Sequence, residues 1–175
     1  MLGGSQGAQS INRAMVAALP RLLTAHPTVR VIHQTGERDC EEVAMAYRDA
    51  RLEAEVSPFL FDVPRAFRQA DLIVSRSGAT TVAEITACGK PAILIPFPHA
   101  IHGHQEHNAR VLDQAGAARV ILDRDLSGEV LAQAIRALIE DRKRLDEMGN
   151  HSRAFGRPDS AERIVTACRG LIEQA

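Results

Sequence analysis

Two glycine-rich turns in this 175-residue chain have the composition of a phosphate-binding cradle. Residues 3–8 have the sequence Gly-Gly-Ser-Gln-Gly-Ala, residues 76–81 have the sequence Arg-Ser-Gly-Ala-Thr-Thr, and each turn leads into a helical pattern. Glycine lets the backbone approach an anion closely, a hydroxyl can donate to it, and the following helix presents free N–H groups and the positive end of its dipole. The turns therefore predict an anion site, although the first, taken alone, is equally compatible with an ordinary start of a helix.

Glu84, which follows the second turn, has two interpretations. Thr81 and Glu84 have the spacing of a capping box, in which the two side chains satisfy N–H groups at the start of a helix. A carboxylate here could instead accept both hydroxyls of a ribose, as the acidic residue of Rossmann sites does. Spacing alone favours the capping box.

A histidine cluster and an aspartate pair are the candidate metal ligands. Four histidines fall between His99 and His107, and His104 and His107 would share a helical face. The HExxH pattern is absent and prolines mark a loop, so we favour a loop that hydrogen-bonds a sugar or phosphate over a metal site, with a merely solvated loop still open. Asp123 and Asp125 form a lone DxD motif, which we expect to be surface.

Short apolar runs alternate with amphipathic stretches along most of the chain, which predicts a doubly wound, Rossmann-like parallel α/β sheet in one domain spanning residues 1–175. The predicted strands are 29–33, 71–75, 92–96 and 119–122. The predicted helices are 41–51, 80–88 and, after residue 127, a helical pattern to the end that is interrupted near Gly149 and at 156–158.

The second turn directly follows an apolar strand, so it should lie at the carboxyl edge of the sheet, where ligands of open α/β folds bind. Two such turns on one edge could hold a diphosphate between two helix N-termini. Only Met1 and Leu2 precede the first turn, whereas a buried strand needs about five residues. The first strand is therefore either a stub or was cut from a longer chain, and we favour the cut.

Composition excludes several classes of protein. Lys and Arg total 21 against 22 Asp and Glu, whereas a nucleic-acid binder needs a basic face. Five Phe, one Tyr and no Trp leave few platforms for stacking bases. Three distant cysteines without a CxxC motif favour a reducing cytosol over a disulfide scaffold or a thiolate zinc site. No apolar run approaches the ~20 residues that span a bilayer.

Five segments, taken in order, resemble the carboxyl-terminal half of the MurG family, the bacterial UDP-N-acetylglucosamine transferases that complete lipid II in peptidoglycan synthesis. The segments are 3–8 (Gly-Gly-Ser-Gln-Gly-Ala), 59–63 (Phe-Leu-Phe-Asp-Val), 76–84 (Arg-Ser-Gly-Ala-Thr-Thr-Val-Ala-Glu), 96–99 (Pro-Phe-Pro-His) and 104–109 (His-Gln-Glu-His-Asn-Ala). The resemblance covers essentially the whole chain. It implies half of a GT-B glycosyltransferase that is inverting, metal-independent and without a cofactor.

The resemblance also implies roles in binding UDP-N-acetylglucosamine. Ser5 and its glycines would contact the diphosphate from one side, and the start of the second helix from the other. Leu60 would recognise the uracil largely through its backbone, Glu84 would hold the ribose in place of the capping box, and Gln105 would reach the sugar hydroxyls. The complete predicted donor site is Gly4, Ser5, Gln6, Gly7, Phe59, Leu60, Ser77, Gly78, Ala79, Thr80, Thr81, Glu84, His104 and Gln105.

The family binds its lipid-linked muramyl-pentapeptide acceptor in an amino-terminal domain that this sequence lacks. The general base is expected there, so we expect no catalytic residue in this chain and no activity from it alone. The intact enzyme would be cytoplasmic and peripheral on the inner face of the plasma membrane. The final helix, residues 159–174, normally packs on the missing domain, so it should expose Ile164, Val165 and Leu171.

Two alternatives from other functional classes remain open. The chain could be a non-catalytic nucleotide-sugar-binding subunit that acts with a separate membrane-anchored partner, as in the split glycosyltransferase of eukaryotic dolichol-linked oligosaccharide assembly. A nicotinamide-dependent oxidoreductase shares the fold class, but the first turn lacks the GxGxxG spacing and the acidic residue about 20 positions later. The short first strand favours a fragment over a natural subunit.

Overall fold

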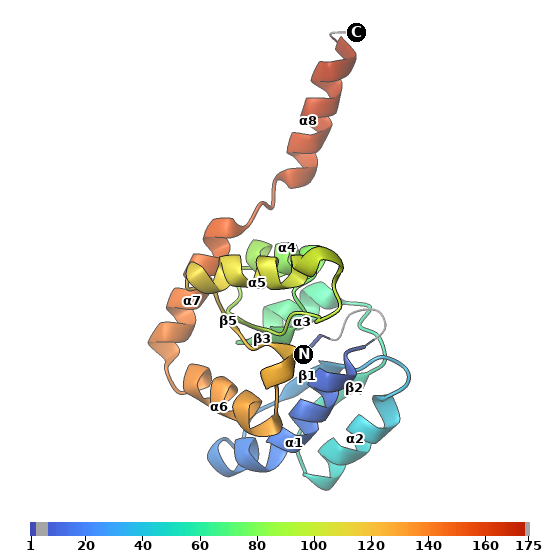
Figure 1. Ribbon diagram of the computed structural model, residues 1–175, viewed down its shortest axis with the longest axis vertical. Coiled ribbons are helices and arrows are strands. Elements are labelled where there is room, and N and C mark those ends of the chain that lie inside the picture. Colours follow the sequence, from blue (N-terminus) through green and yellow to red (C-terminus); the bar gives the residue numbers. More distant parts are fainter. Residues whose placement is uncertain (3–6, 174–175) are drawn as a thin grey trace.

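The computed structural model, which describes residues 1–2 and 7–173, contains a twisted parallel sheet between two layers of helices (Figure 1). The strands are β1 (Val31–Gln34), β2 (Ala54–Ser57), β3 (Ile73–Ser75), β4 (Ala92–Leu94) and β5 (Ala118–Val120). β1 pairs with β2, and β4 pairs with both β3 and β5, always in parallel.

Leu2 joins the two groups of strands. It forms parallel bridges to Gln34 of β1 and Ser75 of β3, and its N–H donates to the Val74 carbonyl at 3.0 Å. The order across the sheet is therefore β2, β1, Leu2, β3, β4, β5. This is the order of a doubly wound Rossmann-type sheet, and it confirms the predicted fold class.

The helices alternate with the strands along the chain and then continue without strands after β5. They are α1 (Gln9–Ala25), α2 (Cys40–Asp49), α3 (Val63–Gln69), α4 (Ala79–Ala87), the 3-10 turn η1 (Ile101–Gly103), α5 (His104–Gln114), the 3-10 turn η2 (Asp123–Asp125), α6 (Gly128–Ile139), α7 (Arg142–Phe155) and α8 (Ser160–Glu173). The predicted interruption at Gly149 is wrong: α7 continues through it, and the missing side chain lets the helix approach the Gly89 carbonyl, which a Cβ would meet at 3.0 Å. The predicted break at 156–158 is confirmed.

Alternate residues of the central strands pack into separate cores on the two faces of the sheet. Val74 and Ile93 face a cluster formed with α1, α2, α6 and α7. Ile73 and Leu94 face the opposite cluster, formed with α3, α4 and α5. Burying one such side chain contributes about 1.5–3 kcal/mol of stability. Because helices cover both faces of the sheet, successive residues of β3 and β4 are all buried, which explains the nearly continuous apolar runs that predicted these strands.

α8 projects away from the rest of the molecule (Figure 1). Ile164 is 63% exposed and Leu171 is 71% exposed, which confirms the expected exposure of this helix. Within the described part of the chain, no helix has both the length and the apolar character to cross a membrane.

Candidate functional site

The sheet reverses its strand order between Leu2 and β3, and the two predicted turns leave from this point. Leu2 pairs with Ser75 in parallel, so the chain enters both turns at the same carboxyl edge. Ligands of open α/β sheets bind at such a switch point. Of the first turn, Gly4, Ser5 and Gln6 lie outside the described residues, whereas Gly7 lies within them.

Gly7 is a position that only glycine fits. Its φ is +74°, and a Cβ added to it would lie 2.1 Å from the carbonyl oxygen of Thr35, the residue after β1. α1 begins two residues later, after Ala8, which has no polar side chain to cap the helix. The first N–H groups of α1 therefore receive no hydrogen bond from their N-cap side chain.

The second turn positions another uncapped helix. Gly78 is the N-cap of α4 and provides no side chain, and no atom of the described residues beyond its chain neighbours lies within 4 Å of a Cβ built on it. Ala79 and Thr80 are exposed at the first turn of the helix. By contrast, Ser127 caps α6 by accepting from the Val130 N–H at 3.2 Å. Within the described residues, the start of α4 therefore combines N–H groups that receive no side-chain cap with open space, as an anion site requires.

The capping box at Thr81 and Glu84 is not formed. α4 begins at Ala79, so Thr81 is the third residue of the helix and cannot be its N-cap. Glu84 is exposed, and its carboxylate has no hydrogen-bond or ion-pair partner among residues 1–2 and 7–173. The helix start explains the error, and the carboxylate is free to accept from a ligand.

Gln105 and His104 begin α5 beside the second turn. The buried Ser77 hydroxyl donates to the Gln105 carbonyl oxygen at 2.8 Å, and the Phe97 N–H donates to Gln105 Oε1 at 3.1 Å. His104 Nδ1 lies 2.7 Å from the Ile101 carbonyl, so this nitrogen carries the proton and donates. Gln105 Nε2 and His104 Nε2 make no hydrogen bond within residues 1–2 and 7–173 and are therefore available to a ligand.

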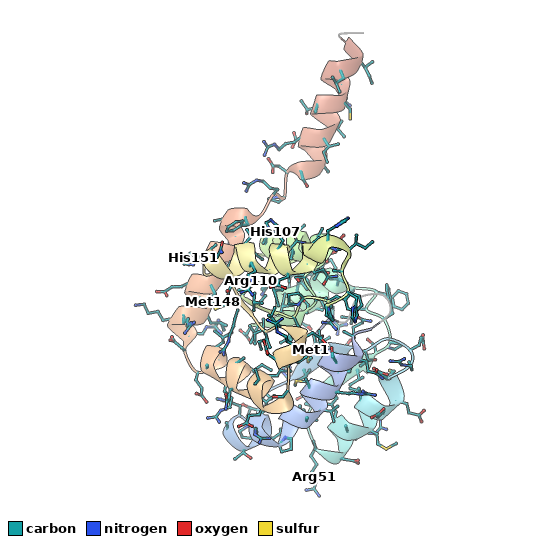
Figure 2. The ribbon with its side chains drawn as sticks, viewed as in Figure 1. Met1, Arg51, His107, Arg110, Met148 and His151 are labelled. Atoms are coloured by element: carbon teal, nitrogen blue, oxygen red, sulfur yellow. The ribbon has the colours of Figure 1, made fainter. Side chains whose placement is uncertain are left out.

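The histidine cluster does not converge on one point. His107 is exposed on α5 (Figure 2), and the described residues contain no group of three or more His, Cys, Asp and Glu that could hold a metal ion. His102 has a φ of +52° in the loop before α5, a left-handed conformation that is uncommon outside glycine.

Phe59 and Leu60 lie in the loop after β2. The Pro58 carbonyl accepts from the Gln34 side chain at 2.9 Å and from the Gly36 N–H at 3.1 Å, which fixes this loop to the end of β1. Phe59 is 49% exposed, whereas Leu60 is half-buried and lines a cavity of about 780 Å³ together with residues of α3 and the sheet.

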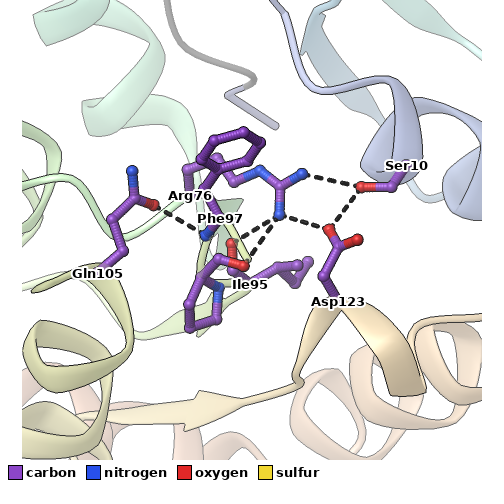
Figure 3. Close-up of polar contacts among 7 residues, drawn as sticks. Ser10, Arg76, Ile95, Phe97, Gln105 and Asp123 are labelled. Atoms are coloured by element: carbon purple, nitrogen blue, oxygen red, sulfur yellow. Dashed lines mark hydrogen bonds and ion pairs between the residues drawn. The ribbon is translucent and has the colours of Figure 1, made fainter. Parts of the chain in front are cut away.

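A network around Arg76, which Figure 3 shows, was not predicted from the sequence. Arg76 Nη1 lies 2.6 Å from Asp123 Oδ1, and Nη2 lies 2.9 Å from the Ser10 hydroxyl. The expectation that Asp123 is a surface residue is wrong, because its side chain is only 21% exposed and bonds Arg76 and Ser10. Asp125 is exposed, as expected. An arginine that directly follows a buried strand was the available signal, since a buried charge needs a partner.

A buried polar cluster beside the start of α1 was likewise not predicted from the sequence. The Asn12 amide donates to the Thr35 carbonyl and to Asp39 Oδ2, both at 2.9 Å, and its oxygen lies 3.0 Å from His33 Nε2. His33 Nδ1 lies 3.0 Å from the Tyr47 hydroxyl. Burial lowers the pKa of His33 to about 3 and raises the pKa of Tyr47, so both groups are neutral at pH 7.

Similarity to known proteins covers nearly the whole chain. Residues 1–164 match the glycosyltransferase family 28 C-terminal domain. UDP-N-acetylglucosamine--N-acetylmuramyl-(pentapeptide) pyrophosphoryl-undecaprenol N-acetylglucosamine transferase of Geobacter sulfurreducens is 50% identical over 165 residues, which are 94% of this chain and 45% of that protein. The protein of the same name from Thermodesulfovibrio yellowstonii is 46% identical, with 99% and 48% covered.

Solved structures are similar over the same span. The crystal structure of Acinetobacter baumannii MurG has a TM-score of 0.86 and 33% identity, covering 99% of this chain and 48% of that one. The S. aureus MnaA-UDP co-structure has a TM-score of 0.68 over 96% of this chain and 44% of that one, and at 16% identity it supports the fold alone. The chain spans about half the length of the relatives it matches. It belongs to glycosyltransferase family 28 and is similar to the carboxyl-terminal half of the family's MurG members.

Proposed function

We propose that this chain is the donor-binding half of an inverting glycosyltransferase. The intact enzyme would move N-acetylglucosamine from UDP-N-acetylglucosamine to the undecaprenyl-diphosphoryl-muramyl-pentapeptide lipid, forming lipid II in peptidoglycan synthesis. The pairing of Leu2 with Ser75 carries the proposal, because it brings both glycine-rich turns to one edge of the sheet. The names of the relatives at 46–50% identity support the same substrates.

The N-termini of α1 and α4 would bind the donor diphosphate. Transfer of the sugar releases UDP, so negative charge grows on the diphosphate in the transition state. Backbone N–H groups and helix dipoles that are already aimed there lower the barrier, by the same physics as an oxyanion hole. We propose that the Ser5 turn acts from the α1 side and that Ala79 and Thr80 act from the α4 side, so that no metal ion is needed.

The remaining predicted residues would recognise the other parts of the donor. The Leu60 backbone and the exposed Phe59 ring would contact the uracil, and the unpartnered Glu84 carboxylate would accept from the ribose hydroxyls. Gln105 Nε2 would donate to a hydroxyl of the N-acetylglucosamine, and His104 Nε2 would accept from one, since their other polar atoms are already bonded.

The acceptor lipid and the general base would belong to the other half of the enzyme. Proton removal from the acceptor hydroxyl needs a base within hydrogen-bond reach, and we assign none here. We propose that the intact enzyme works at the inner face of the plasma membrane and that this chain alone binds the donor without turning it over.

Glu84→Gln is expected to weaken UDP binding about tenfold. A neutral amide oxygen accepts weaker hydrogen bonds from the ribose hydroxyls than a charged carboxylate does. The substituted side chain is exposed, so the melting temperature should not change. Calorimetry with UDP and with 2′-deoxy-UDP checks the assignment: the substitution should cost less affinity for the deoxy ligand, which offers one hydroxyl fewer.

Glu41→Gln is the matched control, since Glu41 is also exposed on a helix but lies in α2, which follows β1 and not the second turn. It should leave both affinities within twofold. Equal weakening by the two substitutions, or an equal effect of Glu84→Gln on UDP and on its deoxy form, would contradict the ribose assignment.

A further inference from the structure

We infer that Arg76 is a positioning residue of the donor site: its guanidinium fixes the second turn relative to the start of α1 and to the loop that carries Gln105, without contacting the donor. This inference rests on the proposed function. Arg76 is the first residue of the second turn, directly before Ser77 and Gly78, and its side chain is only 14% exposed. The guanidinium therefore lies in the interior, below the surface that the turn presents to a ligand.

The guanidinium joins segments that are remote in sequence. Nη1 donates to the carbonyl oxygens of Ile95 and Pro96, each at 3.2 Å, and to Asp123 Oδ1 at 2.6 Å. Nη2 donates to the Ser10 hydroxyl at 2.9 Å. Through these bonds Arg76, which follows β3, holds the ends of β4 and β5 and the first turn of α1 (Figure 3).

Ser10 and Asp123 complete the connection to the first turn. The Ser10 hydroxyl accepts from Arg76 and donates to Asp123 Oδ1 at 2.7 Å, so one carboxylate oxygen receives both partners. Ser10 is the second residue of α1. The distance and orientation between the N-termini of α1 and α4 are thus fixed by side chains that a ligand need not touch.

A second set of hydrogen bonds connects Arg76 to Ser77, its neighbour in sequence, through the loop after β4 and Gln105. Arg76 binds the Pro96 carbonyl, the next residue, Phe97, donates its N–H to Gln105 Oε1, and the Gln105 carbonyl accepts from the Ser77 hydroxyl. The resulting ring closes through the peptide bond between Arg76 and Ser77. It fixes the side-chain oxygen of Gln105 and so directs Gln105 Nε2.

The charge of Arg76 is already balanced within the network. Asp123 lies at hydrogen-bond distance, the two N–H groups of Nη1 serve three acceptors, and the Phe97 ring lies 5.5 Å from the guanidinium carbon. A guanidinium with these partners adds little net attraction for a phosphate. Arg76 instead raises the affinity by holding both turns in place before the ligand binds, so that binding does not have to order them.

Arg76→Met is expected to raise the Kd for UDP about tenfold and to leave the Kd for uridine within twofold, because only the diphosphate contacts depend on the spacing of the two helices. Asp123→Ala should have the same effect, and the double variant should lose no more than the worse single one, since both act through one network. Arg76→Lys, which keeps the charge but not the fork of donors, should still weaken UDP binding and provides a second variant if the methionine does not fold.

Arg142→Met is the control, because Arg142 forms an exposed ion pair with Asp71 and lies on α7 rather than at the carboxyl edge. It should change neither affinity. Three outcomes would overturn the inference: UDP and uridine weakened equally by Arg76→Met, a loss with Arg76→Met but none with Asp123→Ala, which would indicate direct phosphate contact, or no loss at all. Absence of UDP binding by the unsubstituted chain would instead overturn the proposed function.

Discussion

Replacing Gly7 by alanine should lower the free energy of unfolding by about 3 kcal/mol. A left-handed backbone costs an L-residue roughly 1–2 kcal/mol, and the Cβ would lie 2.1 Å from the Thr35 carbonyl oxygen, so the turn or the loop after β1 must move. Urea unfolding followed by circular dichroism measures the loss. Because Gly7 leads into α1, the displacement should also weaken UDP binding.

Gly78→Ala is the matched control for this prediction. Gly78 has an ordinary φ of −61° and open space around its Cα, so alanine should cost less than about 1 kcal/mol, the difference between the two residues as a helix N-cap. Similar losses at Gly7 and Gly78 would show that the first turn does not pack against Thr35 as described.

Replacing Asn12 by alanine should destabilise the protein by about 4 kcal/mol, because it leaves His33, Asp39 and the Thr35 carbonyl without their buried partner. For a chain of this size that corresponds to a fall in melting temperature of roughly 8–16 °C. Differential scanning calorimetry at pH 7, where His33 is neutral, measures it.

Asn150→Ala tests whether the loss at Asn12 comes from the buried network. Asn150 is also an asparagine within a helix, but it is exposed on α7, so alanine there should change stability by no more than about 0.5 kcal/mol. A loss at Asn12 no larger than at Asn150 would contradict the described hydrogen bonds.

The sequence predicted the elements whose burial is most uniform. β3 and β4 are nearly all apolar because helices cover both faces of the sheet, and an apolar run of that kind has few other interpretations. β2 (Ala54–Ser57) was missed because it pairs on one side with β1 and is only partly buried, so polar residues interrupt its apolar pattern. Helix starts were harder to place: the spacing of Thr81 and Glu84 resembles a capping box, but the N-cap of α4 is Gly78, three residues before Thr81.

Contacts between distant segments could not be predicted from spacing. Ser77 and Gln105 are 28 positions apart, and Arg76 and Asp123 are 47 apart, so only the folded sheet brings them to one edge. Asn12 and His33 carried a weak signal, as polar residues within apolar patterns. The proposed roles of Glu84 and Leu60 come from the family resemblance, because the residue pattern alone left the first open and did not indicate the second.

We propose that two helix N-termini at one edge of the sheet bind a nucleotide diphosphate without a cation. Calorimetry of this chain with UDP and with uridine, each in EDTA and in excess magnesium, is the decisive test. We expect UDP to bind at least about tenfold more tightly than uridine, with the same Kd in both buffers, because backbone N–H groups supply the difference. UDP binding that requires magnesium, or that is no tighter than uridine binding, would contradict the claim.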